Sequence, residues 1–308
     1  MPLHAQARAF LDHWNAQPPI DFDRIDAPSL RTSMALPVSS SADPVARIDD
    51  MWIDRPAGRL RLRVYTPESS PRPWPTTLYF YGGGFVLGRP EQSDPICRAL
   101  ARRANTLVVS VDYRQAPEAP FPSAVADALD SLRWVQDNAG ALGGDATRIA
   151  VAGDSAGGNL AAVLAQQLSR HDVALRHQLL IYPPLDPAMA TSSWRDLATG
   201  HGLTAPWMRW YWRQYLPDER AARDPRASPL LAADLQGLPA ATIFTAEYDP
   251  LRDEAEAYAT ALREAGVPVT LRRWNGQIHG FMLMPDWMDD AATAYEEAAA
   301  ALRNAFAV

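Results

Sequence analysis

Short apolar runs alternate with segments of helical periodicity over most of the chain. Residues 59–65 alternate between arginine and apolar side chains, the pattern of a strand with one face in solvent. Continuous apolar runs follow, as in strands that are buried on both faces of a sheet. These buried strands are predicted at Thr76–Tyr81, Thr106–Val111, Arg148–Ala152, Gln178–Tyr182, Ala241–Thr245 and Val267–Trp274.

The segments between these runs have the length and periodicity of helices. They are predicted at Asp94–Ala104, Ser123–Asn138, Ala156–Arg170, Pro250–Ala265 and Asp289–Ala305. Strands and helices in this alternation predict an α/β fold, with a mostly parallel central sheet flanked by helices.

Two regions depart from this alternation. Residues 1–50 begin with an amphipathic helix at Ala5–Trp14 and continue as proline-rich and serine-rich sequence, through the serine run at 39–41, without a strand pattern before Met51. Residues 188–228 form an insertion with two short helical stretches. These stretches are rich in large apolar side chains: Trp194, Trp207, Met208, Trp210, Tyr211, Trp212 and Tyr215. About half of the aromatics are expected to pack within the insertion, and the others to line an apolar pocket under a lid.

Composition narrows the class of protein. With 308 residues, of which 47% are hydrophobic and 21% charged, the chain can bury the core of one large α/β domain, with or without a cap. The net charge is -7 and the basic residues form only short pairs, which argues against a nucleic-acid partner. All 29 basic residues are arginine, so a Ser-Lys dyad and a lysine Schiff base are excluded.

Cysteine usage and hydropathy bear on the compartment. Cys97 is the only cysteine, which excludes an intrachain disulfide and favours a small buried apolar role in a reducing environment. The N-terminus lacks the pattern of a secretory signal, and no apolar stretch is long enough to span a membrane. We therefore expect a cytoplasmic protein without a membrane span.

A turn flanked by glycines follows the predicted strand at 148–152. It reads Gly153-Asp154-Ser155-Ala156-Gly157 and leads into an alanine-rich helix. A serine hydroxyl becomes a useful nucleophile when such a tight turn presents it to a base and to the N–H groups of a helix. Ser155 is therefore the candidate nucleophile, and a plain connecting turn is the alternative.

Three glycines, Gly82 to Gly84, follow the predicted strand that ends at Tyr81. Without side chains, such a loop can turn its N–H groups toward an anion. We expect Gly83 and Gly84 to form an oxyanion hole together with the N–H of Ala156. The alternatives are a glycine loop without a ligand and a phosphate-binding loop, but no Gly-Lys-Ser/Thr follows.

A serine nucleophile also needs a general base and a carboxylate that orients this base. Six histidines are candidates for the base: His4, His13, His171, His177, His201 and His279. Only His279 directly follows a predicted strand, at the sheet edge where open α/β sheets bind ligands. Asp249 also follows a strand and is the expected partner of His279, with Glu247 and Asp253 as rivals. The order serine, aspartate, histidine is that of the α/β-hydrolase triad.

These motifs resemble those of the hormone-sensitive-lipase-like family of α/β-hydrolase carboxylesterases over almost the whole chain. The resemblance rests on four segments: Gly153–Gly158, Asp112–Glu118 with Phe121-Pro122, Asp249–Glu254 and His279–Phe281. It implies hydrolysis of small-molecule esters with short to medium acyl chains, without a cofactor or metal. It also implies a cap of residues 1–50 and 188–228 over a catalytic domain of residues 51–187 and 229–308, and it allows a homodimer.

The chain departs from the family pattern at two positions. Tyr81 stands where the oxyanion loop usually has a histidine, and Gln115 replaces a usual leucine. Because the expected oxyanion donors are backbone groups, we expect a competent loop with an altered rate or substrate range. The amide of Gln115 needs a hydrogen-bond partner if it is buried.

Other functions use the same fold. The same triad would serve an amidase or peptidase, because the shape of the pocket selects the leaving group, and an acyltransferase if a lid excludes water. A non-catalytic receptor for a small ligand, with a broken triad, is the alternative from another class. Since all three residues are present, the sequence favours the enzyme.

Overall fold

Eight strands form a single sheet in the computed structural model, which describes residues 2–34, 43–68, 72–168 and 175–307. They are β1 (Arg47–Ile53), β2 (Leu60–Thr66), β3 (Trp74–Phe80), β4 (Leu107–Asp112), β5 (Gly144–Asp154), β6 (Leu175–Ile181), β7 (Ala241–Tyr248) and β8 (Val269–Ile278). Their order across the sheet is β1-β2-β4-β3-β5-β6-β7-β8. Only the β1–β2 and β2–β4 pairs of this sheet are antiparallel, so the prediction of a mostly parallel sheet is confirmed.

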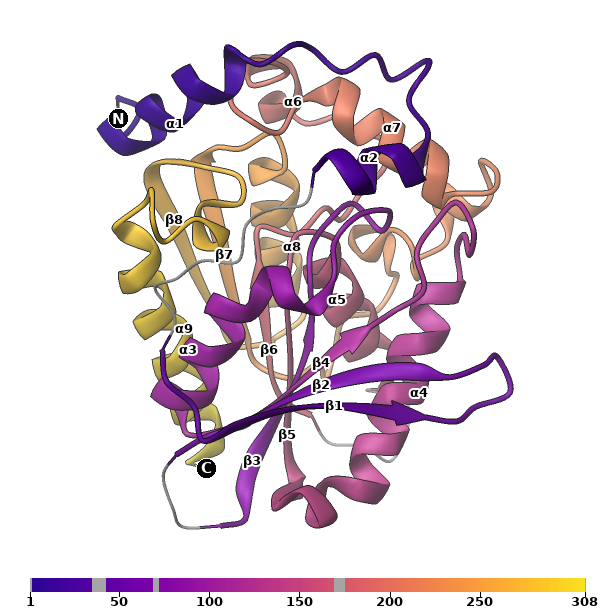
Figure 1. Cartoon of the computed structure of the whole chain (residues 1–308), viewed down its shortest axis with the longest axis vertical. Coiled ribbons are helices and arrows are strands. Elements are labelled where there is room, and N and C mark those ends of the chain that lie inside the picture. Colours follow the sequence, from indigo (N-terminus) through magenta and orange to yellow (C-terminus); the bar gives the residue numbers. More distant parts are fainter. Residues whose placement is uncertain (1, 35–42, 69–71, 169–174, 308) are drawn as a thin grey trace.

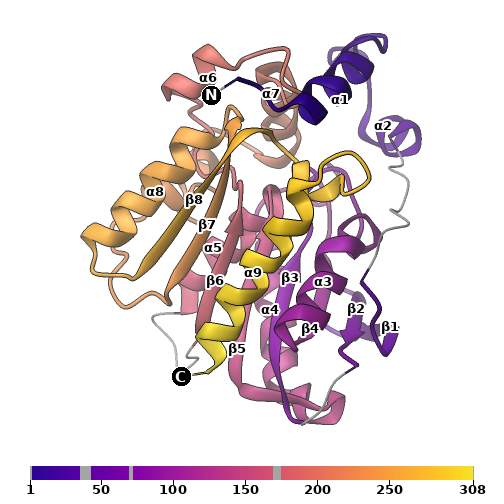
Figure 2. The same ribbon diagram turned by 90° about the vertical axis from the view of Figure 1, so that its left-hand side faces the viewer.

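Helices cover both faces of the sheet (Figures 1 and 2). One face carries α3 (Asp94–Ala104) and α9 (Asp290–Phe306). The other carries α4 (Ser123–Asn138), α5 (Ala156–Leu168) and α8 (Arg252–Glu264). The predicted bounds of α3 and α4 are confirmed, and the predicted end of α5 at Arg170 lies outside the described residues. Short 3-10 turns lie at Pro90–Ser93, Ala139–Leu142, Ala221–Arg223, Pro229–Leu231 and Phe281–Leu283.

Four further helices lie together above the sheet, at the end where the parallel strands finish (Figure 1). They are α1 (Ala5–Asn15), α2 (Ala27–Ser33), α6 (Ser192–Asp196) and α7 (Ala205–Tyr215), and we call them the cap helices. The sequence pattern did not predict α2, because seven residues are too few for a clear periodicity. Its local chemistry is nevertheless helical: the side chain of Asp26 accepts the N–H of Ser29 at 2.7 Å, and Pro28 stands in the first turn.

The strand pattern starts earlier than expected. Met51 was the expected start, and this is wrong because β1 begins at Arg47. As an edge strand, β1 is exposed or half-buried at every residue except Ile53, and its side chains need not alternate between apolar and polar. It is held by its ladder to β2, in which Arg47 pairs with Thr66 and Ile53 with Leu60.

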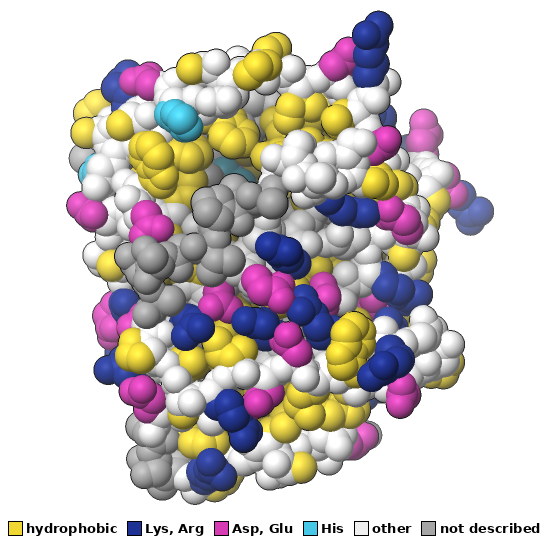
Figure 3. Space-filling model, in the orientation of Figure 1, with side chains coloured by type: hydrophobic (Ala, Val, Ile, Leu, Met, Phe, Trp, Pro, Cys, Tyr) yellow, Lys and Arg dark blue, Asp and Glu magenta, His cyan; other side chains and the backbone are white. Residues whose placement is uncertain are grey.

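The surface differs between the two ends of the molecule. On the face shown in Figure 3, hydrophobic side chains gather toward the cap helices, and a band of mixed charge crosses the middle over β1 and β2. In this band Arg61 pairs with Glu91 at 2.7 Å and Arg63 with Asp50 at 3.0 Å. Within the described ranges, no helix has the length and apolar character needed to cross a membrane.

Candidate active site

Ser155 occupies the sharp turn between β5 and α5. Its φ is +51°, in the left-handed region that strains a residue with a side chain. The N–H of Ser155 donates to the carbonyl of Ile181 on β6 at 2.8 Å, which holds the strained turn against the sheet. The side chain remains 9% exposed, so the turn presents the hydroxyl at the end of the strands.

The two glycines that flank Ser155 are required by close backbone contacts. A Cβ on Gly153 would overlap the backbone of Gly157. A Cβ on Gly157 would overlap the carbonyl oxygen of Phe80, the last residue of β3. The backbones of β5 and α5 therefore approach closely at this turn, and β3 is a second close neighbour.

His279 directly follows β8, and its imidazole lies between a serine and a carboxylate. Its Nε2 is 3.0 Å from Oγ of Ser155, and its Nδ1 is 2.7 Å from Oδ2 of Asp249. A proton on Nδ1 that is donated to Asp249 leaves Nε2 free to accept the hydroxyl of Ser155. The structure thus brings together the three residues that the sequence singled out.

The two rival carboxylates contact other groups. Glu247 accepts the N–H of Gly276 at 2.6 Å, and Asp253 accepts the N–H of Ser193 in the cap at 2.8 Å. The remaining histidines also lie elsewhere. His4 caps α1, His13 stacks near Trp287, His177 contacts Thr242, His201 stacks on Tyr248, and His171 is outside the described residues.

Two buried residues beside the site were missed in the sequence. The ring of Tyr182, which follows β6, packs on the imidazole of His279 with centroids 4.6 Å apart. Asp154, immediately before the serine, accepts the hydroxyl of Tyr79 at 2.7 Å and of Ser93 at 3.1 Å. Burial raises the pKa of the Asp154 carboxyl. Both residues stand at the carboxyl ends of strands, which is the signal that could have identified them.

The glycine loop lies directly against the serine turn. A Cβ on Gly82 would be 3.1 Å from the Cβ of Ser155. Gly83 and Gly84 have φ values of +124° and +62°, which favour glycine. Among the backbone hydrogen bonds between described residues outside regular elements, none is donated by the N–H of Gly83 or Gly84. Ala156 is the first residue of α5, where a helix has no internal partner for its N–H. These three N–H groups therefore remain the candidate oxyanion donors.

The two residues that depart from the family pattern contact each other behind this loop. Nε2 of Gln115 donates to the hydroxyl of Tyr81 at 3.1 Å and to two carbonyls of the loop. Gln115 is half-buried, so the amide has the partners that it needs. Tyr81 is completely buried and its ring stacks on Tyr113, with centroids 4.5 Å apart.

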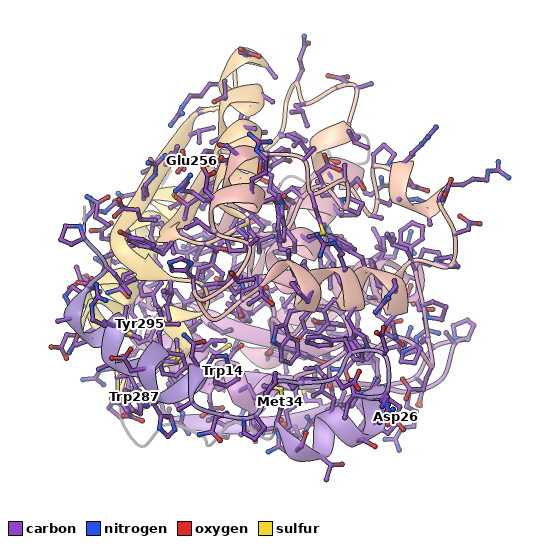
Figure 4. All side chains as sticks on the ribbon, turned by 90° about the horizontal axis from the view of Figure 1, so that it is seen from above. Trp14, Asp26, Met34, Glu256, Trp287 and Tyr295 are labelled. Carbon is purple, nitrogen blue, oxygen red and sulfur yellow. The ribbon has the colours of Figure 1, made fainter. Side chains whose placement is uncertain are left out.

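The cap helices also pack against the loop. A Cβ on Gly84 would overlap the ring of Tyr211 in α7, and Phe85 stacks on Tyr215 with centroids 3.9 Å apart. The large apolar residues singled out in the insertion are each at most 8% exposed. Trp207 also lines a cavity of about 850 Å³ between α7 and the N-terminal segment. Figure 4 looks down on the cap and shows Trp14 and Met34, which line the same cavity.

Neither thiol nor metal chemistry is indicated by the described part of the chain. Cys97 is completely buried, and burial raises the pKa of its thiol well above the usual value, which fits the role of a small apolar residue. Across residues 2–34, 43–68, 72–168 and 175–307, no group of three or more histidine, cysteine or acidic side chains could hold a metal ion.

The sheet, the strained serine turn and the Ser155–His279–Asp249 hydrogen bonds define a protein of the α/β-hydrolase class. A family model described as alpha/beta hydrolase fold matches residues 77–283. The chain belongs to the hormone-sensitive-lipase-like family of α/β-hydrolase carboxylesterases, and it is an ester hydrolase.

The similar proteins cover between 82% and 99% of the chain. The arylesterase of Saccharolobus solfataricus is 38% identical over 288 residues, which are 92% of this chain and 94% of that protein. The ethyl acetate hydrolase of Pseudomonas putida is 39% identical over 259 residues, 82% of this chain and 81% of the relative. Among solved structures, the hyperthermophilic esterase of Pyrobaculum calidifontis is 42% identical with a TM-score of 0.93, and the match covers 99% of both chains.

Proposed function

We propose that the protein hydrolyses carboxylic esters of short to medium acyl chain length through an acyl-enzyme on Ser155. The observation that carries this proposal is the unbroken hydrogen-bonded series from Oγ of Ser155 through His279 to Asp249. It lies beside the glycine loop, in which the N–H groups of Gly83 and Gly84 donate to no backbone carbonyl of the described residues. A receptor would not need a strained serine turn aligned with a base.

The chemistry follows from this geometry. Oγ of Ser155 attacks the ester carbonyl carbon while its proton passes to Nε2 of His279. The N–H groups of Gly83, Gly84 and Ala156 stabilise the negative charge on the carbonyl oxygen. When the tetrahedral intermediate collapses, His279 protonates the leaving alcohol. Water then attacks the acyl-enzyme by the same route and releases the acid.

Asp249 serves His279 and not the substrate. Its buried carboxylate keeps the Nδ1 proton in place and stabilises the imidazolium that forms during attack. The ring of Tyr182 limits rotation of the imidazole from the side. Together with the three backbone N–H groups, this set of side chains serves both acyl transfer steps.

The proposed substrate range rests on the cap. The N-terminal segment and the insertion, expected at residues 1–50 and 188–228, would act together as a cap whose apolar inner side holds the ester. Tyr211 lies over Gly84 and leaves little room beside the oxyanion donors, which favours a short acyl chain. Two relatives, an ethyl acetate hydrolase and an arylesterase, have names that agree with small esters.

The test is hydrolysis of p-nitrophenyl esters from acetate to dodecanoate by the wild type, Ser155→Ala and Ser131→Ala. Ser131 is a matched control because its buried hydroxyl bonds only within α4, to the carbonyl of Ala128. We expect the Ser155 variant to lose activity by roughly 10⁴-fold or more, and the Ser131 variant to keep it. A folded wild type that hydrolyses no ester would contradict the proposal, and equal rates for all chain lengths would contradict the short-chain pocket.

A further inference from the structure

The loop that carries the proposed oxyanion donors is a tight turn from Gly82 to Gly88. The carbonyl of Gly83 accepts the N–H groups of Val86 at 3.1 Å and Leu87 at 2.8 Å, so the turn is closed within itself. These internal bonds fix the shape of the loop. They do not fix its distance from Ser155, which must be set by groups outside the loop.

The side chain of Gln115 contacts the residue just before this loop and the last two residues of the loop. Nε2 of Gln115 lies 3.1 Å from the hydroxyl of Tyr81, 3.0 Å from the carbonyl of Leu87 and 2.8 Å from the carbonyl of Gly88. An amide nitrogen has two N–H groups, so three acceptors share two donors. Gln115 therefore links both ends of the loop to the segment that follows β4.

Tyr81, which Gln115 contacts, is itself held in place by several neighbours. Its hydroxyl accepts from Gln115 and donates to Oδ1 of Asp112 at 3.2 Å. Its carbonyl accepts the hydroxyl of Tyr113 at 2.8 Å, and the two rings stack. Asp112 is held in turn by Nε of Arg61 at 2.9 Å. The phenol is thus anchored by its ring, its backbone and its hydroxyl.

We propose that Gln115 is a positioning residue for ester hydrolysis, which together with Tyr81 sets the place of the Gly83 and Gly84 N–H groups relative to Ser155. This inference rests on the function proposed above. The two departures from the family pattern then form one unit, because the leucine usual at position 115 could not bond the Tyr81 hydroxyl or the loop carbonyls.

The role makes a quantitative prediction. The oxyanion forms only in the transition state, so a displaced donor lowers kcat without weakening substrate binding. We expect Gln115→Leu to lower kcat by roughly ten- to hundredfold, the loss that a misplaced catalytic group causes, with KM changed less than twofold. Tyr81→Phe removes one of the three acceptors and should cause a smaller loss.

The chain offers a matched control in Gln178→Leu. Nε2 of Gln178 also donates to a backbone carbonyl, that of Pro239 at 3.0 Å, but it lies in the middle of β6, three residues before the strand end that faces the site. Gln178 is completely buried, so its replacement should lower the melting temperature at least as much as that of Gln115. Its kcat should stay within twofold of the wild type.

A transition-state analogue separates positioning from a general loss of structure. With an alkyl trifluoromethyl ketone, Oγ of Ser155 adds to the carbonyl carbon, the proton passes to His279 and the oxygen becomes an oxyanion. The matched methyl ketone binds mainly without this addition. We expect Gln115→Leu to weaken binding of the trifluoromethyl ketone by the same factor by which kcat/KM falls. The affinity for the methyl ketone should stay within twofold of the wild type. Tyr81→Phe combined with Gln115→Leu should lose less than the product of the two single losses.

Two results would overturn the inference. One is a Gln115→Leu variant whose kcat/KM stays within twofold of the wild type. The other is a loss of affinity that is equal for both ketones, as a purely structural defect would give. Failure of the function itself looks different, because the wild type would then neither hydrolyse esters nor be inhibited by the trifluoromethyl ketone.

Discussion

The ring of Tyr211 fills the space that a side chain on Gly84 would need. A residue of cap helix α7 therefore borders the proposed oxyanion hole directly, and the ring limits the room beside the ester carbonyl. Because α7 also stacks on Phe85 through Tyr215, the cap and the loop are packed as one unit. The specificity of the site should therefore respond to side chains of the cap.

Tyr211→Ala should shift activity toward longer acyl chains. Removal of the ring opens space beside Gly84, and each methylene that the new space accommodates contributes about 1 kcal/mol. The ratio of kcat/KM for the octanoyl ester to that for the acetyl ester should rise roughly five- to tenfold. Tyr211→Phe is the control, because the ring that fills the space remains, and its ratio should match the wild type. An unchanged ratio in Tyr211→Ala would show that the ring does not limit the acyl chain.

The adjacent glycines Gly157 and Gly158 should respond very differently to replacement by alanine. A Cβ in Gly157→Ala would overlap the carbonyl of Phe80, whereas a Cβ in Gly158→Ala would lie 3.0 Å from the side chain of Pro183. We expect Gly157→Ala to lose about 3 kcal/mol of unfolding free energy and most activity. Gly158→Ala should stay within about 1 kcal/mol, because the gain in helix propensity offsets the tight contact. Urea unfolding and ester hydrolysis measure both, and equal losses in the two variants would contradict this account.

Much of the site follows from the sequence because parallel strands finish at one edge of the sheet. Ser155, Asp249 and His279 each follow an apolar run, so the strand pattern predicts that they meet. The pattern does not by itself separate Asp249 from its rivals Glu247 and Asp253. The glycines two positions before and after Ser155 could also be explained from the sequence, because a tight strand-to-helix turn requires them locally. Both inferences need only local sequence and the general topology of α/β folds.

Other parts of the site depend on contacts between distant segments, and no local pattern reports them. The guanidinium of Arg31 reaches the loop from a helix too short for periodicity to reveal. The partner of Gln115 is Tyr81, more than thirty positions away in the sequence, and the two residues meet only because β3 and β4, which they follow, are parallel neighbours in the sheet. Packing of Tyr182 on His279 likewise depends on the neighbouring order of β6, β7 and β8.

The buried imidazole of His177 should make the folded protein less stable in acid. His177 is buried at the start of β6 beside Thr242, and burial lowers the pKa of its imidazole to about 4. Between pH 6.5 and 4 the unfolded chain binds a proton that the native protein does not, so the unfolding free energy falls as the pH falls. From pH 7 to 5 the loss from this group is about 2 kcal/mol.

His177→Gln tests this, because the amide can still bond Thr242 and does not titrate. Relative to the wild type, this variant should gain about 2 kcal/mol of unfolding free energy between pH 7 and 5, measured by urea unfolding. The exposed His13 supplies the control variant, His13→Gln, which should follow the wild type. A wild type and His177→Gln that lose stability in parallel would show that His177 binds its proton equally in both states.

Arg31 connects the N-terminal part of the cap to the loop that carries the proposed oxyanion donors. Its Nε donates to the carbonyl of Val86 at 2.7 Å, and the rest of the guanidinium holds Glu118 and the carbonyl of Ala116. A lysine cannot make this forked set of bonds. If α2 stabilises the loop through this side chain, its loss should loosen the loop and lower the rate without unfolding the protein.

We therefore expect Arg31→Lys and Arg31→Met to lower kcat/KM for short esters by roughly three- to tenfold. Hydrogen exchange at the N–H groups of Val86 and Leu87, which close the loop, should become faster in both variants. Arg24→Met is the matched control, because Arg24 lies in the same segment and its side chain is 89% exposed beside Asp21. If the Arg31 variants match Arg24→Met in rate and exchange, the cap and the loop are not coupled through this residue. If only exchange increases, the loop tolerates the added motion during catalysis, and Arg31 does not set the position of its donors.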